Sequence, residues 1–121
     1  DELLLWADSY RLQQVFVNLL DNALAFCRNQ SDAKIKLCAK VGQNKVQLFV
    51  HNNGPAIPAA QLPGLFQPFV SKRAGGSGLG LAIVRRIMQA HGATVQHRSD
   101  LGWSVSFVLQ FFNQQQDTEN E

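Results

Sequence analysis

Four glycines within the six residues from Gly75 to Gly80 lead directly into a helical pattern that ends at Gly92. A loop of this kind lets backbone N–H groups converge, and the first helical turn adds unpaired donors at the positive end of the helix dipole. The stretch therefore predicts an anion site whose natural ligand is a polyphosphate. It lacks the Gly-Lys-Ser/Thr ending of a P-loop and does not form a dinucleotide-binding strand–loop–helix unit. A surface loop before an ordinary amphipathic helix would have a similar sequence, so this stretch alone does not distinguish a polyphosphate site from a structural loop.

Two asparagines, Asn18 and Asn22, lie one turn apart on a second predicted helix, which begins near Tyr10 with Asp8 or Ser9 as its N-cap. The buried face of this helix is predicted to contain Leu12, Val15, Phe16, Leu19, Leu20 and Ala23. Asparagine is a mediocre helix former, so a pair of them invites an explanation. They are either a solvated edge or neutral oxygen ligands for a hard cation such as Mg²⁺.

The remaining patterns describe the elements that would position these groups. Alternating apolar residues predict strands at 34–41 and 46–50, joined by a turn at 42–44, and two more strands at 93–98 and 103–111. In the first of these, Ile35, Leu37, Ala39 and Val41 are expected on one side. Residues 3–7 are expected to form a buried strand and residues 65–69 a hydrophobic anchor. The segment 70–74, which contains the basic residues Lys72 and Arg73, has the composition of a small lid.

Composition places limits on the function. The chain has 121 residues, 45% of them hydrophobic and 17% charged, with a net charge of +2. These values indicate one globular domain, assigned to 1–112 with a polar, disordered tail at 113–121, and give no reason to expect nucleic-acid binding.

Cys27 and Cys38 lack metal-ligand spacing and are expected to be buried, reduced thiols. No apolar run approaches the ~20 residues of a membrane span. The start at Asp1 suggests a fragment of a longer protein.

Taken together, four motifs in order resemble the catalytic and ATP-binding domain of bacterial two-component sensor histidine kinases, within the superfamily that includes DNA gyrase, Hsp90 and MutL. Residues 11–23 resemble the asparagine box and residues 52–57 the first glycine box. Residues 66–69 match the phenylalanine box and residues 76–84 the second glycine box. The very short lid is similar to that of the nitrogen-regulation subgroup.

This resemblance implies a fold and a site. The fold is a two-layer α/β (α+β) sandwich with a mixed β-sheet packed against helices, the Bergerat ATP-binding fold. ATP and Mg²⁺ would bind between the helices, with Asn22 as the metal ligand, Asn18 as a possible second one, and Asn18 and Lys72 as catalytic residues. The residues implied to contact the nucleotide are Asn18, Asn22, Asn52, Gly54, Ala56, Ile57, Phe69, Lys72, Gly76, Ser77, Gly78, Leu79, Gly80 and Leu81.

The implied function is transfer of the ATP γ-phosphate to a histidine on a separate dimerisation domain, for relay to a response regulator receiver domain. His51, His91 and His97 lack the context of that histidine and are expected to be structural or surface residues. The domain alone is therefore expected to be a monomer that does not autophosphorylate. It is expected to be cytoplasmic, and anchoring of the parent protein in the bacterial inner membrane stays open.

Two departures from the family pattern leave alternatives to a working kinase domain open. Asn52 replaces the usual adenine-reading aspartate, and Ala56 replaces a glycine, so a degenerate nucleotide-binding or docking module with weak or no kinase activity is the main alternative. An ATPase that hydrolyses ATP itself would need a glutamate where the chain has Asn18, because an amide cannot accept a proton from water. A serine kinase of the anti-sigma type remains possible from the fold alone.

Overall fold

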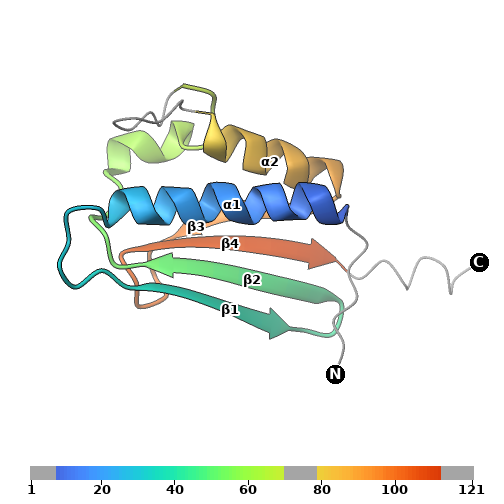
Figure 1. The fold of residues 1–121 in the computed structure, drawn as a ribbon. Coiled ribbons are helices and arrows are strands. Elements are labelled where there is room, and N and C mark those ends of the chain that lie inside the picture. Colours follow the sequence, from blue (N-terminus) through green and yellow to red (C-terminus); the bar gives the residue numbers. More distant parts are fainter. Residues whose placement is uncertain (1–7, 70–78, 113–121) are drawn as a thin grey trace, which may run out of the picture.

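The computed structural model describes residues 8–69 and 79–112, which form a helical layer on a sheet. In chain order the elements are α1 (Ser9–Phe26), β1 (Ile35–Val41), β2 (Lys45–Asn52), the 3-10 helix η1 (Ala59–Gly64), α2 (Gly80–Ala90), β3 (Thr94–Arg98) and β4 (Val105–Phe112). Figure 1 shows α1 and α2 side by side above one face of the sheet. The expected two-layer α+β sandwich is confirmed.

The strand order is β1-β2-β4-β3, and every pairing among the described residues is antiparallel. The expectation of a mixed sheet is wrong for this part of the chain. The segment that contains α2 connects β2 to β3, which is the kind of long connection that parallel neighbours use. The β3–β4 hairpin, however, folds back so that β4 lies between β2 and β3. The strands that run in the same direction are therefore never neighbours.

The core lies between the helices and the sheet. Val15 and Leu19 of α1 are fully buried, and they pack with Val84 of α2 and with Phe107 and Leu109 of β4. Val15 and Leu19 are among the positions that the helical period predicted for the buried face of α1. In the edge strand β1, by contrast, the expected inner side is poorly covered, because Leu37 is 53% exposed and Val41 60% exposed.

The helix ends match the capping expectations. The Asp8 side chain accepts hydrogen bonds from the N–H groups of Tyr10 and Arg11, at 3.0 and 3.2 Å. Gly92, just beyond α2, has a φ of 65°, the left-handed conformation that ends a helix most easily with glycine. The strands agree with prediction to within about two residues, as is usual for boundaries. The strand expected at 3–7, the lid at 70–74 and the tail at 113–121 lie outside the described residues.

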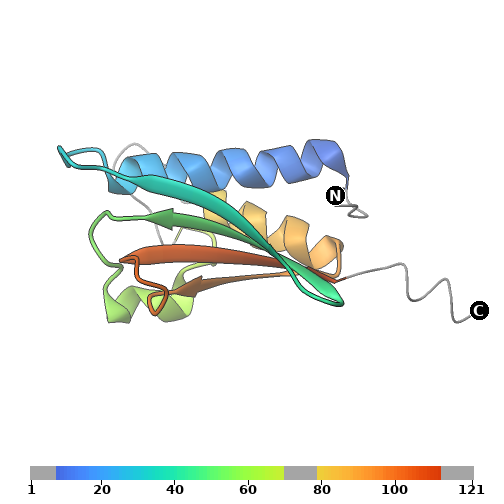
Figure 2. The ribbon, with the colours of Figure 1, turned by 90° about the horizontal axis from the view of Figure 1, so that it is seen from below.

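The opposite face of the sheet carries no helix of the described chain, as Figure 2 shows from below. Cys38 is exposed on β1, so the expectation that both cysteines are buried is wrong for this one, whereas Cys27 is buried. Both thiols are free. Across residues 8–69 and 79–112, no helix is both long and apolar enough to cross a membrane.

Candidate nucleotide-binding site

Asn18 connects the two helices. Its side-chain Nδ2 donates to the backbone carbonyl oxygen of Gly80 over 3.4 Å, and Gly80 is the first residue of α2. Asn18, the first of the asparagine pair predicted on α1, therefore lies beside the N-terminal end of α2, although the two partners are 62 positions apart in the chain. Unpaired backbone N–H groups at a helix N-terminus favour an anion. The fold thus brings a possible cation ligand and a possible anion site together.

Asn22 lies one turn further along α1 and is 4% exposed. Its side-chain oxygen Oδ1 is buried and has no hydrogen-bond partner among the described residues. A buried acceptor without a donor costs free energy, so such an atom usually serves a ligand or an ordered water. Within the described chain, no three His, Cys, Asp or Glu residues form a metal-binding group. Neutral oxygens such as that of Asn22 fit Mg²⁺, which keeps several of its waters.

Asn52 ends β2 and is 1% exposed. Its Oδ1 accepts a hydrogen bond from the backbone N–H of Gly54 at 2.8 Å and also contacts the Cys27 thiol at 3.9 Å. Because a backbone N–H can only donate, this contact fixes the orientation of the amide. The amide nitrogen Nδ2 is then the end left buried without a partner. At this position an aspartate would present an acceptor, whereas Asn52 presents a donor.

Gly54 is required by packing. A Cβ on this residue would lie 2.9 Å from the backbone oxygen of Phe26, at the end of α1, and 3.0 Å from Asn52 Oδ1. The Ser104 hydroxyl oxygen lies 2.5 Å from the carbonyl oxygen of Gly54 and 3.2 Å from that of Asn52, and its single proton is donated to this pair, which fastens the segment before β4 to this loop. Sequence reasoning did not assign that role to Ser104, because only the folded register brings residues 50 or more positions apart into contact.

Asn53 has a structural role beside the site. Its side chain accepts from the N–H of Lys34 at 2.8 Å and donates to the carbonyl of Asp32 at 2.9 Å. These bonds hold the loop between α1 and β1 against the end of β2.

Other predicted site residues occupy varied positions. The side chains of Ile57 and Leu81 belong to the hydrophobic core, and that of Ala56 is exposed. In the phenylalanine box, Phe66 packs edge-to-face on Phe107 at 6.1 Å. Phe69 is instead 66% exposed with a φ of 67°, so its contact with a nucleotide stays a prediction. Leu79 directly precedes α2. Lys72, Gly76, Ser77 and Gly78 lie outside the described residues.

A helical layer on an antiparallel sheet, with an asparagine amide beside the start of a helix that follows a glycine-rich sequence, is typical of a nucleotide-binding α+β domain. Comparison with known families makes the assignment specific. The model described as "Histidine kinase-, DNA gyrase B-, and HSP90-like ATPase" matches residues 7–113. The chain belongs to this family.

Two similar proteins are sensor kinases. The sensory histidine kinase/phosphatase NtrB of Rhizobium meliloti is 36% identical over 105 residues, covering 75% of this chain and 28% of NtrB. The adaptive-response sensory kinase SasA of Prochlorococcus marinus is 35% identical over 107 residues, covering 84% of this chain and 28% of SasA. The chain therefore spans little more than a quarter of these relatives.

Solved structures agree in fold. The catalytic domain of histidine kinase ThkA superposes with a TM-score of 0.75 at 31% identity, covering 88% of this chain and 69% of that one. ThkA in complex with the response regulator protein TrrA superposes with a TM-score of 0.74 at 29% identity, covering 93% of this chain and 31% of the other. The Bergerat-type fold is thereby confirmed.

Proposed function

We propose that this chain is the ATP-binding catalytic domain of a sensor histidine kinase and transfers the ATP γ-phosphate to a histidine on a separate dimerisation domain. The phosphohistidine would then pass its phosphoryl group to an aspartate of a response regulator. The observation that carries the proposal is the contact between Asn18 and Gly80, because it joins the asparagine box to the start of the helix that follows the glycine loop. The complex of ThkA with TrrA supports the choice of partner.

The orphaned oxygen of Asn22 supports a metal role, with this oxygen on Mg²⁺ or on one of its waters and Asn18 as a possible second ligand. When bound, Mg²⁺ would supply charge neutralisation on the phosphates. The chain's own groups would position the substrate. Backbone N–H groups of residues 76–80 and of the first turn of α2 would receive the phosphates, and Lys72 would reach the terminal one. The short lid favours the nitrogen-regulation subgroup.

The base would lie beside Asn52, Gly54 and Ala56. Its exocyclic amine is a donor, and the unpaired end of Asn52 is also a donor, so this contact would be weaker than one to an aspartate. We therefore expect ATP to bind with reduced affinity. A domain that hydrolyses ATP by itself is not favoured, because the amide of Asn18 cannot act as a general base.

Calorimetric titration with a non-hydrolysable ATP analogue, with and without Mg²⁺, tests the site. We expect Mg²⁺-dependent binding that Asn22→Ala weakens by roughly tenfold or more, the scale of one lost charge-assisted contact. The matched control is Asn44→Ala, the same change in the exposed hairpin turn. Equal binding by the two variants would contradict the metal role.

Kinase function is tested separately. A fusion of this domain to a histidine-bearing helical domain should incorporate labelled phosphate from ATP, and no incorporation despite normal nucleotide binding would refute the kinase function.

A further inference from the structure

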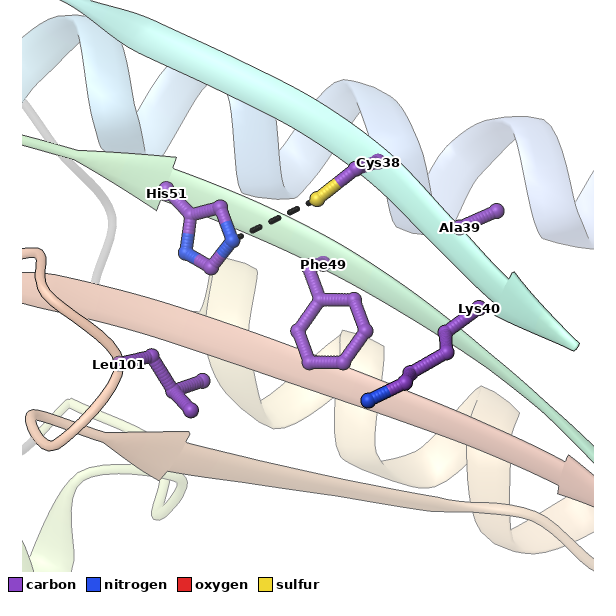
Figure 3. A pocket seen from close by; sticks show the side chains of 6 residues that line it. All are labelled: Cys38, Ala39, Lys40, Phe49, His51 and Leu101. Atoms are coloured by element: carbon purple, nitrogen blue, oxygen red, sulfur yellow. Dashed lines mark hydrogen bonds between the residues drawn. The ribbon is translucent and has the colours of Figure 1, made fainter. Parts of the chain in front are cut away.

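The open face of the sheet holds a second constellation, on the side away from α1 and α2 (Figure 3). The Cys38 Sγ on β1 lies 3.5 Å from the imidazole Nε2 of His51 on β2. The other ring nitrogen, Nδ1, lies 2.7 Å from the hydroxyl oxygen of Ser106 on β4. The strand register produces this row, because His51 is opposite Ser106 and diagonal to Cys38, which is opposite Phe49.

The imidazole of His51 is held in place. It stacks between the rings of Phe49 and Trp103, with centroid distances of 5.6 and 5.4 Å and interplanar angles of 17° and 11°. His51 is 6% exposed, and Ser106 is fully buried. Burial, and to a lesser extent the charge of Lys36, lower the pKa of His51 below its ordinary value of 6.5. A pKa below 6.5 leaves the ring mainly neutral at pH 7, and a neutral imidazole can accept a proton.

The thiol faces a place where a reactant can bind. A shallow pocket of about 390 Å³ lies beside it and is lined by Cys38, Ala39, Lys40, Phe49, His51 and Leu101. Figure 3 shows the Lys40 ammonium and the Leu101 side chain at this pocket. Lys36 and Lys40 flank Cys38 at alternate positions of β1, on the same face of the sheet. This pair of positive charges favours a reactant that carries a carboxylate.

We propose that Cys38 is a thiol–disulfide exchange site, with His51 as its proton acceptor, Ser106 as the residue that positions His51, and a small carboxylate-bearing disulfide as the co-reactant. In the tautomer that this role requires, Nδ1–H of His51 donates to the Ser106 hydroxyl, and Nε2 takes the thiol proton. The Cys38 sulfur attacks one sulfur of the disulfide. A new S–S bond forms, the original S–S bond breaks, and the leaving thiolate takes the proton from His51. The products are a mixed disulfide on Cys38 and one free small thiol.

The chain provides an internal control in Cys27. This thiol is buried, and its nearest polar contacts are the side-chain oxygens of Asn52 and Asn53, at 3.9 and 3.8 Å. Neither amide oxygen can serve as a base at neutral pH. Cys27→Ala therefore isolates the proposed thiol, and Cys38→Ala isolates the control thiol.

The test measures the rate of reaction with dithiobis(nitrobenzoate), an aromatic disulfide with two carboxylates, at pH 7. Exposure alone would make Cys38 faster than Cys27, so the reference is the free peptide of residues 35–41, which keeps both flanking lysines. We expect Cys27→Ala protein to react roughly tenfold faster than this peptide, and His51→Gln in that background to remove the gain. A rate no higher than that of the peptide, or one unchanged by His51→Gln in protein shown to be folded by circular dichroism, would overturn the proposal.

Three further variants keep the test decisive if His51→Gln does not fold. Ser106→Ala should slow the reaction, while Ser106→Thr, which keeps the hydroxyl, should restore it; equal rates for the two would refute the positioning role. Lys40→Gln should slow dithiobis(nitrobenzoate) but leave the uncharged dithiodipyridine almost unaffected. Equal slowing of both reagents would show that the pocket does not select a carboxylate.

Discussion

The side chain of His91 joins the end of α2 to the beginning of α1. Its Nε2 accepts a hydrogen bond from the backbone N–H of Asp8 at 3.0 Å, and its Nδ1 lies 2.8 Å from the carbonyl oxygen of Ile87. Because a carbonyl only accepts, Nδ1 carries the proton, and Nε2 is the nitrogen that accepts from Asp8. The residue that caps α1 is thus fixed by the residue that ends α2. The helices on which the nucleotide site is proposed are fastened at this end as well as by Asn18.

Removing this connection should destabilise the domain. We expect His91→Ala to lower the free energy of unfolding by about 1–2 kcal/mol, because the N–H of Asp8 loses its partner and packing around the half-buried ring is lost. His91→Gln is the matched control, since its amide oxygen can still accept a hydrogen bond. Urea unfolding measures both variants. Equal stability of His91→Ala and the unchanged chain would contradict the role.

Local patterns were enough to predict α1 and the positions of its two asparagines. The cap at Asp8, the apolar period and the spacing of Asn18 and Asn22 are all properties of neighbouring residues, and each agrees with the structure. The same holds for α2 and its stop at Gly92. Such features depend on contacts within one or two helical turns, so the sequence specifies them without knowledge of the fold.

The resemblance to the family predicted the two-layer fold correctly, but three features that depend on strand pairing were not predicted correctly. The alternation in β1 indicated one buried side, but its position at the edge of the sheet leaves Leu37 exposed. The insertion of β4 between β2 and β3 makes the described sheet antiparallel. The row that joins Cys38, His51 and Ser106 depends on the register across two pairings. Each of these features depends on which strands pair, and the alternation of residues within a single strand does not show which strand lies beside it.

Gly54 and Gly80 should respond in opposite ways to an added methyl group. Gly54→Ala would place its Cβ 2.9 Å from the backbone oxygen of Phe26, which cannot move without shifting α1. We expect a loss of about 1–3 kcal/mol in the free energy of unfolding. For Gly80→Ala, nothing lies within 4 Å of the new Cβ, and alanine is the better helix former, so stability should be unchanged or higher. Thermal denaturation measures the stability of both variants, and equal losses of stability would contradict the packing argument.

His97 should make the domain less stable in mild acid. Its ring packs edge-to-face on Phe107 at 5.8 Å, and its Nε2 is buried without a partner among the described residues. Burial lowers the pKa of His97 below 6.5. As the pH falls below 6.5, the unfolded chain binds a proton that the folded state resists, so the free energy of unfolding decreases until the pH passes below the folded-state pKa.

The variant His97→Phe should reduce this slope, because phenylalanine keeps an aromatic contact with Phe107 and does not titrate. His51 titrates in the same direction, since burial and Lys36 lower its pKa, so His51→Gln in the same background should flatten the curve further. Urea unfolding between pH 5 and pH 8 measures the effect, a range chosen to span the usual histidine titration. An unchanged slope in His97→Phe would show that this ring does not couple to folding.

Asn52→Asp should tighten ATP binding and identify the group that reads the base. A carboxylate at this position keeps one oxygen for the N–H of Gly54 and presents the other as an acceptor in place of the unpaired Nδ2. We expect a gain of about tenfold in affinity, the scale of one added charge-assisted hydrogen bond. The unliganded variant should be less stable, because the buried carboxylate then lacks a partner.

Titration with inosine triphosphate, which carries a carbonyl instead of the amine, provides the control for specificity, and Asn44→Asp provides the control for charge. If both nucleotides gain equally, or neither does, Asn52 does not contact the exocyclic amine. A gain confined to ATP would establish that the natural asparagine limits the affinity of this site.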